Sequence, residues 1–397
     1  TMKIVIAPDS YKGCAASAEI CDLIERGVKK VFPDAEIVKI PLADGGEGSV
    51  DALYAAKQGV KVRTAATSPD GFKIYPNILL YGESTAIVEM AMASGLNMVN
   101  TNKLNPLVAT SYGTGEMIVS AMEKLRSSNG DATFISHSEK DLFGKVEKKK
   151  IIVTLGGSAT NDCGIGMAAA LGYKFYDIYG DELLPFAENM INVDEIDSSE
   201  VNEHIFNFDI IGLCDVANKL YGDKGATSVY GKQKGVNESN FEILEEGMKN
   251  MARLFKSTFS VDVSDVEMAG AAGGMGAALM VFCNAKLCKG IDRILDFVDF
   301  DNQIKDASLV ITGEGCFDAQ SKYGKVVDGV LNRTNNLSIP TLVMAGQYLE
   351  DSDNQSVNNN VTVVATMADG MTREESILNY ATLIPQRIEE ALSDMKL

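Results

Sequence analysis

Histidine is nearly absent from this chain, since His137 and His204 are the only two among 397 residues. A zinc site built on imidazole groups therefore has few ligands to draw on. Seven cysteines are present, but no two of them form a Cys-x-x-Cys pair, so we expect reduced thiols in a cytoplasmic protein. With so little histidine, we expect any general base to be an aspartate, a glutamate or a lysine.

Excess positive charge and long apolar runs are also missing. The formal net charge is −19, which argues against nucleic acid or an anionic membrane as a partner, because those contacts need clustered Lys and Arg. The one basic run, Lys145–Lys150, is interpreted as a solvated loop. Apolar runs such as Ala277–Cys283 are far shorter than the ~18 residues of a membrane span. No charged segment followed by an apolar one opens the chain, so we expect no secretory signal.

The chain is too long for one hydrophobic core, which predicts two domains. Strand and helix signals alternate along it. Short apolar runs end in polar residues, as in "KIVIAPDS" and "DIIGLCD", and helical periodicity lies between them. Ser17, for example, can cap a helix whose apolar positions follow the 3.6-residue period until Pro33. This βα pattern predicts a mainly parallel sheet covered by helices.

One region breaks this pattern. Residues 61–89 contain short alternating runs interrupted by Pro-Asp-Gly and Tyr-Gly-Glu, which predicts antiparallel hairpins. The βα pattern is clearest again after Asp306. We therefore predict one α/β domain formed by residues 1–60 plus 295–397 and interrupted by a second α/β domain with a mixed sheet, residues 61–294.

Five apolar runs end in small residues followed by carboxylates, and several of these ends are rich in glycine. The carboxylates are Asp9, Asp44, Glu47, Asp162, Asp215, Glu314 and Asp318. In open α/β sheets, ligands bind beyond the carboxyl ends of the strands. Carboxylates there suit a metal ion, and exposed backbone N–H groups suit a phosphate chain. A single such Asp is more often a turn former or a helix cap, but five together favour a site.

Known nucleotide-binding motifs leave one alternative. No GxxxxGK[ST] sequence occurs, which excludes a P-loop. Gly164-Ile-Gly166-Met-Ala-Ala169 fits the GxGxxA pattern, with Asp181 downstream, so a nicotinamide-dependent dehydrogenase is a rival hypothesis. Eight residues separate the predicted strand from Gly164, however, whereas that motif needs its glycines in the first tight turn. The match is therefore interpreted as a glycine- and alanine-rich helix start.

Eight longer motifs follow one another nearly end to end. They are "IVIAPDSYKG", "PLADGGEGS", "VEMAMASGL", "NPLVATSYGTGEMI", "LGGSATNDCGIGMAAALG", "CDVANKLYGDKGATSVYGKQKG", "AGAAGGMGAAL" and "DASLVITGEGCFDAQSKYGK". With these motifs the chain resembles the bacterial glycerate kinases of the two-domain type-1 family, which are D-glycerate 2-kinase-like. The resemblance implies a flavodoxin-like doubly wound domain interrupted by an inserted α/β domain, with the active site in the cleft between them. It also implies Mg²⁺-dependent phosphoryl transfer from ATP to D-glycerate, giving ADP and 2-phosphoglycerate rather than 3-phosphoglycerate.

Lys12, Asp162 and Asp215 are the candidate catalytic residues. Lys12 would pair with a phosphate or with the glycerate carboxylate, and Asp162 or Asp215 would accept the hydroxyl proton. Asp215 and Asp318 are the candidate metal ligands. The motifs at the strand ends supply the candidate substrate- and nucleotide-binding residues. These are Asp9, Ser10, Asp44, Gly45, Gly46, Glu47, Gly156, Gly157, Ser158, Asn161, Gly273, Gly274, Gly313, Glu314, Gly315, Ser321 and Lys325.

Structural roles remain open for several of these residues. Lys325 can simply start a helix, Ser10 and Ser158 can be caps, and Asn161 can serve a left-handed turn. Gly273 and Gly274 either cradle phosphates or allow a helix to pack closely on a strand.

The sequence departs from the family pattern at three positions and in one loop. Cys316 stands where the family usually has Arg, and Lys219 and Lys232 stand where it usually has Pro. Extra length at Ser136–Lys149 is interpreted as a surface loop. Losing the Arg could remove a phosphate contact, so a non-catalytic protein that binds the same ligands is a further alternative. The sequence leaves the oligomeric state open, a homodimer included.

Overall fold

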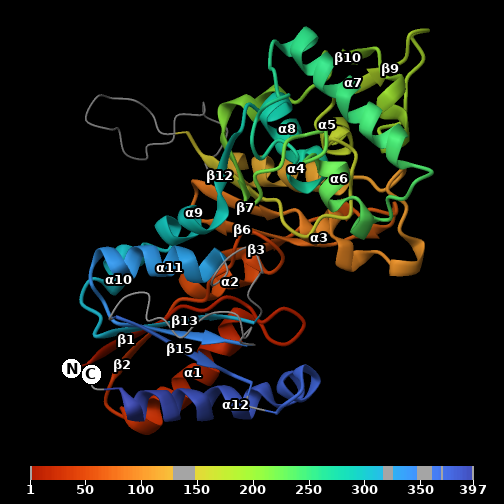
Figure 1. Cartoon of the computed structure of the whole chain (residues 1–397). Helices are drawn as coiled ribbons and strands as arrows, with labels where there is room; N and C mark the ends of the chain where they lie inside the picture. The colour runs from red at the N-terminus through yellow and green to blue at the C-terminus, as the bar shows by residue number, and fades with distance from the viewer. Residues whose placement is uncertain (1, 128–147, 316–324, 347–359, 368–369, 396–397) are drawn as a thin grey trace. The chain divides into compact units, whose positions relative to one another are not determined.

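The computed structural model describes residues 2–127, 148–315, 325–346, 360–367 and 370–395. The chain folds into two compact units. Unit 1 comprises residues 1–44, 51–58 and 290–397, and unit 2 comprises residues 45–50 and 59–289. Each unit is an α/β structure with its own sheet (Figure 1).

The sheet of unit 1 has five parallel strands in the order β2-β1-β13-β14-β15. Its strands are β1 (Lys3–Ile6), β2 (Glu36–Lys39), β13 (Leu309–Glu314), β14 (Thr341–Ala345) and β15 (Val361–Ala365). Numbered along unit 1 alone, this order is 2-1-3-4-5, the flavodoxin-like arrangement of a doubly wound sheet. The predicted fold class is confirmed.

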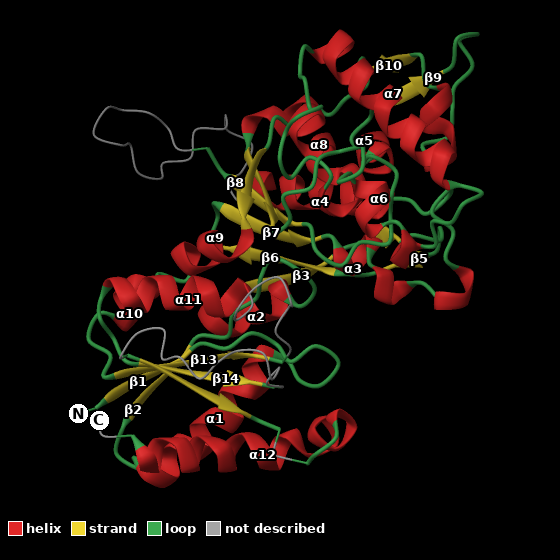
Figure 2. Ribbon diagram, viewed as in Figure 1, coloured by secondary structure: helices red, strands yellow, loops and turns green. Residues whose placement is uncertain are grey.

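Helices cover both faces of this sheet (Figure 2). They are α1 (Ser17–Val31), α2 (Ser49–Lys57), α9 (Gly290–Phe297), α10 (Phe300–Ile304), α11 (Lys325–Asn336) and α12 (Arg373–Asp394). α1 and α12 lie together on one face, and α9 and α11 lie on the other (Figure 1). α1 ends two residues before Pro33, as predicted. Any side chain at Gly27 would collide with Ile388, so this glycine allows α1 and α12 to pack closely.

Unit 2 contains a mixed sheet of six strands in the order β12-β11-β8-β7-β6-β3. These strands are β3 (Val60–Arg63), β6 (Asn77–Tyr81), β7 (Thr85–Glu89), β8 (Lys150–Thr154), β11 (Asp209–Cys214) and β12 (Lys286–Lys289). β7, β8, β11 and β12 are parallel, whereas β6 runs antiparallel to both β7 and β3. The antiparallel pairing predicted for residues 61–89 is therefore present.

Two short ladders complete the strands of unit 2. They are β4 (Ala66–Thr67) with β5 (Lys73–Ile74), and β9 (Lys174–Tyr176) with β10 (Glu195–Asp197). The helices of this unit are α3 (Ala91–Ser94), α4 (Tyr112–Ser127), α5 (Ile165–Ala170), α6 (Ala226–Tyr230), α7 (Phe241–Phe259) and α8 (Ala271–Cys283). Their 3₁₀ counterparts are η1 (Leu96–Met98), η2 (Thr101–Lys103), η3 (Ala187–Asn192), η4 (Glu203–Asn207) and η5 (Lys232–Lys234).

The core of unit 2 is a large apolar cluster that joins the sheet to these helices. Phe282 of α8 lies near its aromatic centre, with its ring centroid 4.6 Å from that of Tyr173 and 5.3 Å from that of Phe255. Among the helices that the structure describes, none is long and apolar enough to cross a membrane. Residues 136–147 of the predicted surface loop lie outside the described residues.

Candidate active site

Three predicted carboxylates of unit 1 follow neighbouring parallel strands. Asp9 comes shortly after β1, Asp44 follows β2, and Glu314 is the last residue of β13. Because β2, β1 and β13 are adjacent and parallel, their carboxyl ends meet at one edge of the sheet, where doubly wound folds bind ligands. The Nζ atom of Lys12 lies 3.9 Å from the Oδ2 atom of Asp44 at the same edge.

These carboxylates repel one another. Burial, with a further contribution from Asp44, raises the pKa of Asp9 to about 7. Burial also raises the pKa of Glu314 to about 8, followed by the charges of Asp9 and Asp44. Lys12 and Lys325 lower the pKa of Glu314 by smaller amounts. Burial, with repulsion between the carboxylates added to it, therefore keeps protons on Asp9 and Glu314 up to about neutral pH, and a bound cation would favour their charged forms.

The carboxylate oxygens of this cluster are of the kind that Mg²⁺ prefers. The Oε2 atom of Glu314 is buried and has no hydrogen-bond partner among the described residues. Mg²⁺ is usually held by one or two carboxylates plus substrate phosphates and waters, not by a complete protein cage. In the described ranges, no group of three or more His, Cys, Asp or Glu side chains is arranged to hold a metal ion.

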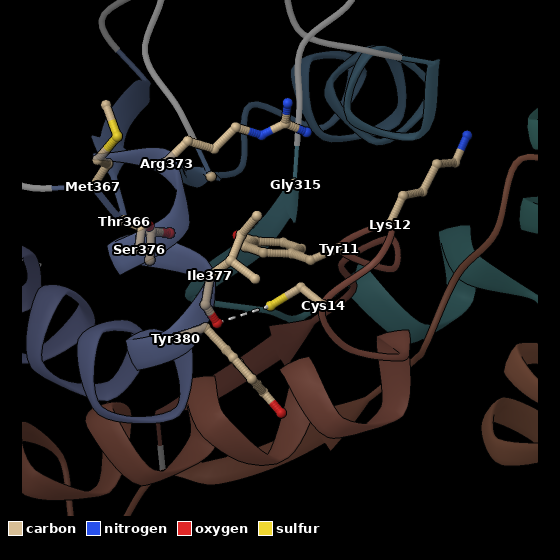
Figure 3. A pocket seen from close by; sticks show the side chains of 11 residues that line it. Tyr11, Lys12, Cys14, Gly315, Thr366, Met367, Arg373, Ser376, Ile377 and Tyr380 are labelled. Carbon is tan, nitrogen blue, oxygen red and sulfur yellow. Dashed lines mark hydrogen bonds between the residues drawn. The ribbon is translucent and has the colours of Figure 1, made fainter. Parts of the chain in front are cut away.

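The loop after β1 also borders a pocket of about 80 Å³ within unit 1. Figure 3 shows the ring of Tyr11 in the middle of its lining, with Lys12 on one side and Arg373 on the other. The hydroxyl of Tyr11 donates to the carbonyl oxygen of Met344 at 3.2 Å. A side chain at Gly315 would collide with Tyr11, so this glycine keeps β13 and the loop in contact. Arg373 is a cation that the sequence reading did not select.

The remaining predicted residues of unit 1 either have structural contacts or lie outside the described residues. Ser10 is half-buried, and its N–H donates to the Oδ1 atom of Asp9 at 2.6 Å. Gly313 is buried within β13, against the backbone of Met344. Lys325 is the first residue of α11, which supports the structural reading left open for it. Cys316, Asp318 and Ser321 lie outside the described residues.

In unit 2, two predicted glycine-rich loops pack against each other. The N–H group of Gly156 donates to the carbonyl oxygen of Gly45 at 3.2 Å. A Cβ atom on Gly156 would collide with the Cα atom of Gly46. Glycine is needed here because the two backbones approach so closely. The structure therefore brings together the loops at residues 45–48 and 155–161, which are more than a hundred residues apart in the sequence.

Glu89, the last residue of β7, holds the first of these loops. Its carboxylate is 3% exposed and accepts hydrogen bonds from the N–H groups of Gly48 and Val50, each at 2.8 Å. Glu47 of the same loop is exposed and accepts a hydrogen bond from Asn97. The sequence predicts Glu47 as a site residue but gives no sign of Glu89, which stands inside the motif "VEMAMASGL" and looks like part of an ordinary strand.

Asp162 is fully buried and surrounded by hydrogen-bond donors. Its Oδ2 atom accepts from the N–H and hydroxyl groups of Ser111, at 2.9 and 2.7 Å. The N–H groups of Gly164 and Gly166 donate to the same carboxylate at 3.0 and 3.4 Å. Burial raises the pKa of Asp162, whereas these donors lower it. The arrangement favours a role in shaping the β8–α5 loop, and the predicted catalytic role stays a prediction.

Lys234 of η5 reaches the same loop. It is 3% exposed, and its Nζ atom lies 2.7 Å from the Oγ atom of Ser158 and 2.7 Å from the carbonyl oxygen of Thr160. Burial lowers the pKa of Lys234 to about 7, against a smaller opposite effect of Asp162. The sequence alone does not indicate this lysine, because "YGKQKG" looks like an exposed polar turn.

Asn161, Gly157 and Asp215 occupy different environments around this loop. Asn161 is buried, and its Nδ2 atom donates to the hydroxyl of Thr227 at 3.0 Å. Gly157 is exposed, with a positive φ of 74°. Asp215 is half-buried directly after β11. Because β11 is parallel to β8 and pairs with it, Asp215 and the loop that begins at Leu155 share one edge of the sheet.

The other glycine motifs of unit 2 serve close packing. Gly273 and Gly274 have positive φ angles of 70° and 92° at the kinked start of α8. Side chains there would collide with Thr160 and Cys163 respectively. A side chain at Gly164 would collide with Ala278, and one at Gly166 with Thr110. Gly164 and Gly166 are thus covered by protein, which explains the GxGxxA match without a dinucleotide.

Comparison with known proteins gives the family. The model of the glycerate kinase family matches residues 4–396. The chain belongs to the glycerate kinase family. Relatives include glycerate 2-kinase of Escherichia coli (strain K12), which is 42% identical over 88% of this chain and 86% of that protein. Glycerate kinase of Bacillus subtilis (strain 168) is 36% identical over 97% of this chain and 95% of that protein.

A solved structure agrees with these relatives. The crystal structure of a Salmonella typhimurium LT2 protein assigned as glycerate kinase 2 matches with a TM-score of 0.82 and 35% identity, over 99% of this chain and 98% of that one. This glycerate kinase family member is therefore a phosphotransferase with the predicted α/β fold. Family membership excludes the nicotinamide-dependent dehydrogenase as an alternative.

Proposed function

We propose that the chain transfers the γ-phosphoryl group of ATP to the 2-hydroxyl of D-glycerate, giving 2-phosphoglycerate and ADP. The observation that carries this proposal is the 42% identity to a glycerate 2-kinase across most of both chains. The site chemistry supports it, because phosphoryl transfer requires positioned cations and N–H donors more than covalent catalysis. Both are available at the strand ends described above.

Magnesium is part of the proposal. Mg²⁺ would neutralise charge on the nucleotide phosphates during transfer. Asp9 and Glu314 of unit 1 would hold it, because they stand at the ends of two paired parallel strands and the buried Oε2 atom of Glu314 has no hydrogen-bond partner among the described residues. Lys12 is exposed at the same edge, where it can pair with an anionic oxygen. Asp215 and Asp318, the predicted metal ligands, remain candidates that variants can test.

Asp215 is the better candidate for the residue that accepts the hydroxyl proton. Asp162 has its oxygens occupied by four donors within the protein, so a substrate hydroxyl would have to displace one of them. Asp215 is half-buried, at the carboxyl end of β11. A carboxylate placed there can take the proton that the glycerate hydroxyl loses as the phosphoryl group arrives.

The proposal also includes a cytoplasmic location, as expected from the sequence. The six cysteines in the described ranges form no disulfide with one another, which suits a reducing compartment.

The decisive experiment is a product assay. Purified protein with ATP, Mg²⁺ and D-glycerate should release ADP, and phosphorus NMR should identify 2-phosphoglycerate. Excess chelator should abolish turnover, and added Mg²⁺ should restore it. Formation of 3-phosphoglycerate alone would correct only the site of transfer. Binding of D-glycerate and ATP without any product would instead favour the non-catalytic alternative raised by Cys316.

A further inference from the structure

Lys234 is a buried cation without an acidic partner at close range. Its Nζ atom contacts a hydroxyl and a carbonyl oxygen, and no salt bridge links it to a carboxylate of the described residues. Burying an ammonium group in this way costs desolvation free energy, and an apolar side chain of similar volume would not carry that cost. A lysine at this position therefore points to a use for its amino group.

The contact with Ser158 suggests that use. A serine hydroxyl has one proton to donate and two lone pairs that accept. The Nζ atom of Lys234 takes one lone pair at 2.7 Å, and no acceptor in the described part of the chain takes the hydroxyl proton. Ser158 is itself 5% exposed and follows Gly157, which is exposed, so its hydroxyl lies just beneath the surface of the loop. The proton of Ser158 is thus available to a ligand.

Two further groups of the same loop are unsatisfied. The Oδ1 atom of Asn161 and the Oγ1 atom of Thr160 are buried and have no hydrogen-bond partner among the described residues. Buried polar atoms are nearly always paired in folded proteins. Asn161 is fully buried, and its open oxygen can accept from a ligand hydroxyl. The loop therefore offers both a donor and an acceptor to a hydroxy acid or a phosphate.

We infer that Lys234 is a positioning residue that orients the Ser158 hydroxyl toward an anionic oxygen of a substrate bound at the β8–α5 loop. The ligand class is a small oxyanion, either the carboxylate of D-glycerate or a phosphate of the nucleotide. Lys234 does not need to touch the substrate, because Ser158 carries the contact and the ammonium charge strengthens it. This inference rests on the proposed function and adds a specific subsite to it.

Protonation of Lys234 is linked to anion binding at such a subsite. A bound oxyanion favours the ammonium form, as an opposite charge nearby does. The charge of Asp162 in the β8–α5 loop also favours the ammonium form of Lys234. The two hydrogen-bond partners of Lys234, Ser158 and Thr160, are neutral. Leu104, which lies beside the next residue, Gly235, is neutral as well. With its pKa near 7, Lys234 loses its charge as the pH rises, so affinity for the anion should fall above about pH 7.

Steady-state kinetics on three variants test the inference. Lys234→Met and Ser158→Ala should each raise the KM of the same substrate ~10-fold or more, with a smaller effect on kcat. The double variant should be little worse than Lys234→Met alone, because Lys234 acts through Ser158. Lys232→Met is the matched control, since Lys232 is exposed on the same 3₁₀-helix, and it should change neither constant by more than ~2-fold.

The substrate whose KM rises identifies the anion. A rise for D-glycerate assigns the subsite to its carboxylate, and a rise for ATP assigns it to a phosphate. In the wild type, that KM should rise from pH 7 to pH 9, and Lys234→Met should lack this pH dependence. Unchanged KM values for both substrates in Lys234→Met would overturn the inference. So would a lower melting temperature with both KM values unchanged, which would indicate a purely structural lysine.

Two further measurements keep the outcomes separate. If Lys234→Met does not fold, Ser158→Ala decides, and unchanged KM values in that variant would refute the subsite. If the wild type does not phosphorylate glycerate, the proposed function fails by itself. In that case, thermal shifts with inorganic phosphate and with D-glycerate still test the subsite. At least one of these ligands should stabilise the wild type and Lys232→Met but not Lys234→Met, and equal stabilisation of all three proteins would refute it.

Discussion

The carboxylate of Glu89 lies 2.8 Å from the backbone N–H of Gly48, and its other oxygen accepts the N–H of Val50 at the same distance. A buried side chain at the end of β7 thus satisfies two backbone donors of a segment about forty residues away. The glycine-rich loop 45–48 is held in place within unit 2 by this carboxylate and by its contact with Gly156.

Glu89→Gln should therefore destabilise the protein. The amide can accept through its oxygen, but its NH₂ group must face the second backbone N–H, which loses its acceptor. We expect the free energy of unfolding to fall by about 1–3 kcal/mol, the usual range for an unsatisfied buried group. Urea denaturation measures the change. The control is Glu182→Gln, at an exposed glutamate of the same unit. Its free energy of unfolding should stay within about 0.5 kcal/mol of the wild-type value. Equal stabilities for the two variants would show that the hydrogen bonds from Gly48 and Val50 to Glu89 do not stabilise the protein.

The two candidate bases, Asp162 and Asp215, should behave differently when each is replaced by Asn. Asp215→Asn should lower kcat by ~10²-fold or more with little change in KM, if this residue takes the hydroxyl proton. Asp162→Asn should destabilise the fold, because its amide nitrogen cannot accept from Ser111, Gly164 or Gly166. Kinetics and thermal melts on both variants separate the roles. A stable Asp162→Asn protein with a ~10²-fold lower kcat would restore Asp162 as the catalytic residue.

Strand and helix positions are largely readable from this sequence. The apolar runs "KIVIAP" and "LVITGEG" become β1 and β13, and the periodic positions after Ser17 become α1. These elements depend on local patterns of buried side chains, which the sequence carries directly. The acidic residues at the strand ends could be found for the same reason, since each follows a recognisable strand.

The partners of buried polar groups could not be read in this way. Glu89 and Lys234 look like a strand residue and a turn residue, and their burial depends on contacts with residues about forty and more than seventy positions away. Asp162 shows the converse, because its position suggested chemistry whereas Ser111, fifty-one residues earlier, occupies its oxygen. Sequence spacing indicates which residue types lie near a site, but only the fold decides which of their atoms are already paired.

Asp9→Asn should make the protein more stable relative to the wild type as the pH rises. The sign follows from the raised pKa of Asp9, about 7 in the folded protein against 3.8 as its ordinary value. Between these values the unfolded chain has lost a proton that the folded chain retains, so wild-type stability falls with rising pH, by about 1.4 kcal/mol per pH unit at most. Asn has no such linkage and can still accept from Ser10.

Melting temperatures of both proteins from pH 4 to pH 8 measure this difference. The advantage of Asp9→Asn should grow up to about pH 7 and then level off. Mg²⁺ with ADP should stabilise the wild type more than the variant, because the carboxylate would contribute to holding the cation. A constant difference in melting temperature at all pH values would show that folding does not raise the pKa of Asp9.

Lys234→Met should show a pH-dependent stability difference of the opposite direction. The pKa of Lys234 falls from 10.5 to about 7 on folding, so between these values the unfolded chain binds a proton that the folded chain does not. Wild-type stability therefore rises with pH in this window, at up to about 1.4 kcal/mol per unit, and the electrostatic penalty is fully present below about pH 7. Met has no such penalty, although it leaves the carbonyl of Thr160 without its donor, a loss that does not depend on pH.

Urea denaturation of the wild type, Lys234→Met and Lys232→Met at pH 6, 7, 8 and 9 measures the linkage. Relative to the wild type, the free energy of unfolding of Lys234→Met should fall steadily from pH 7 to pH 9. That of Lys232→Met should differ from the wild type by the same amount at every pH. Parallel curves for Lys234→Met and the wild type would mean that this lysine keeps its ordinary proton affinity, and the pH dependence expected for anion binding would then lose its physical basis.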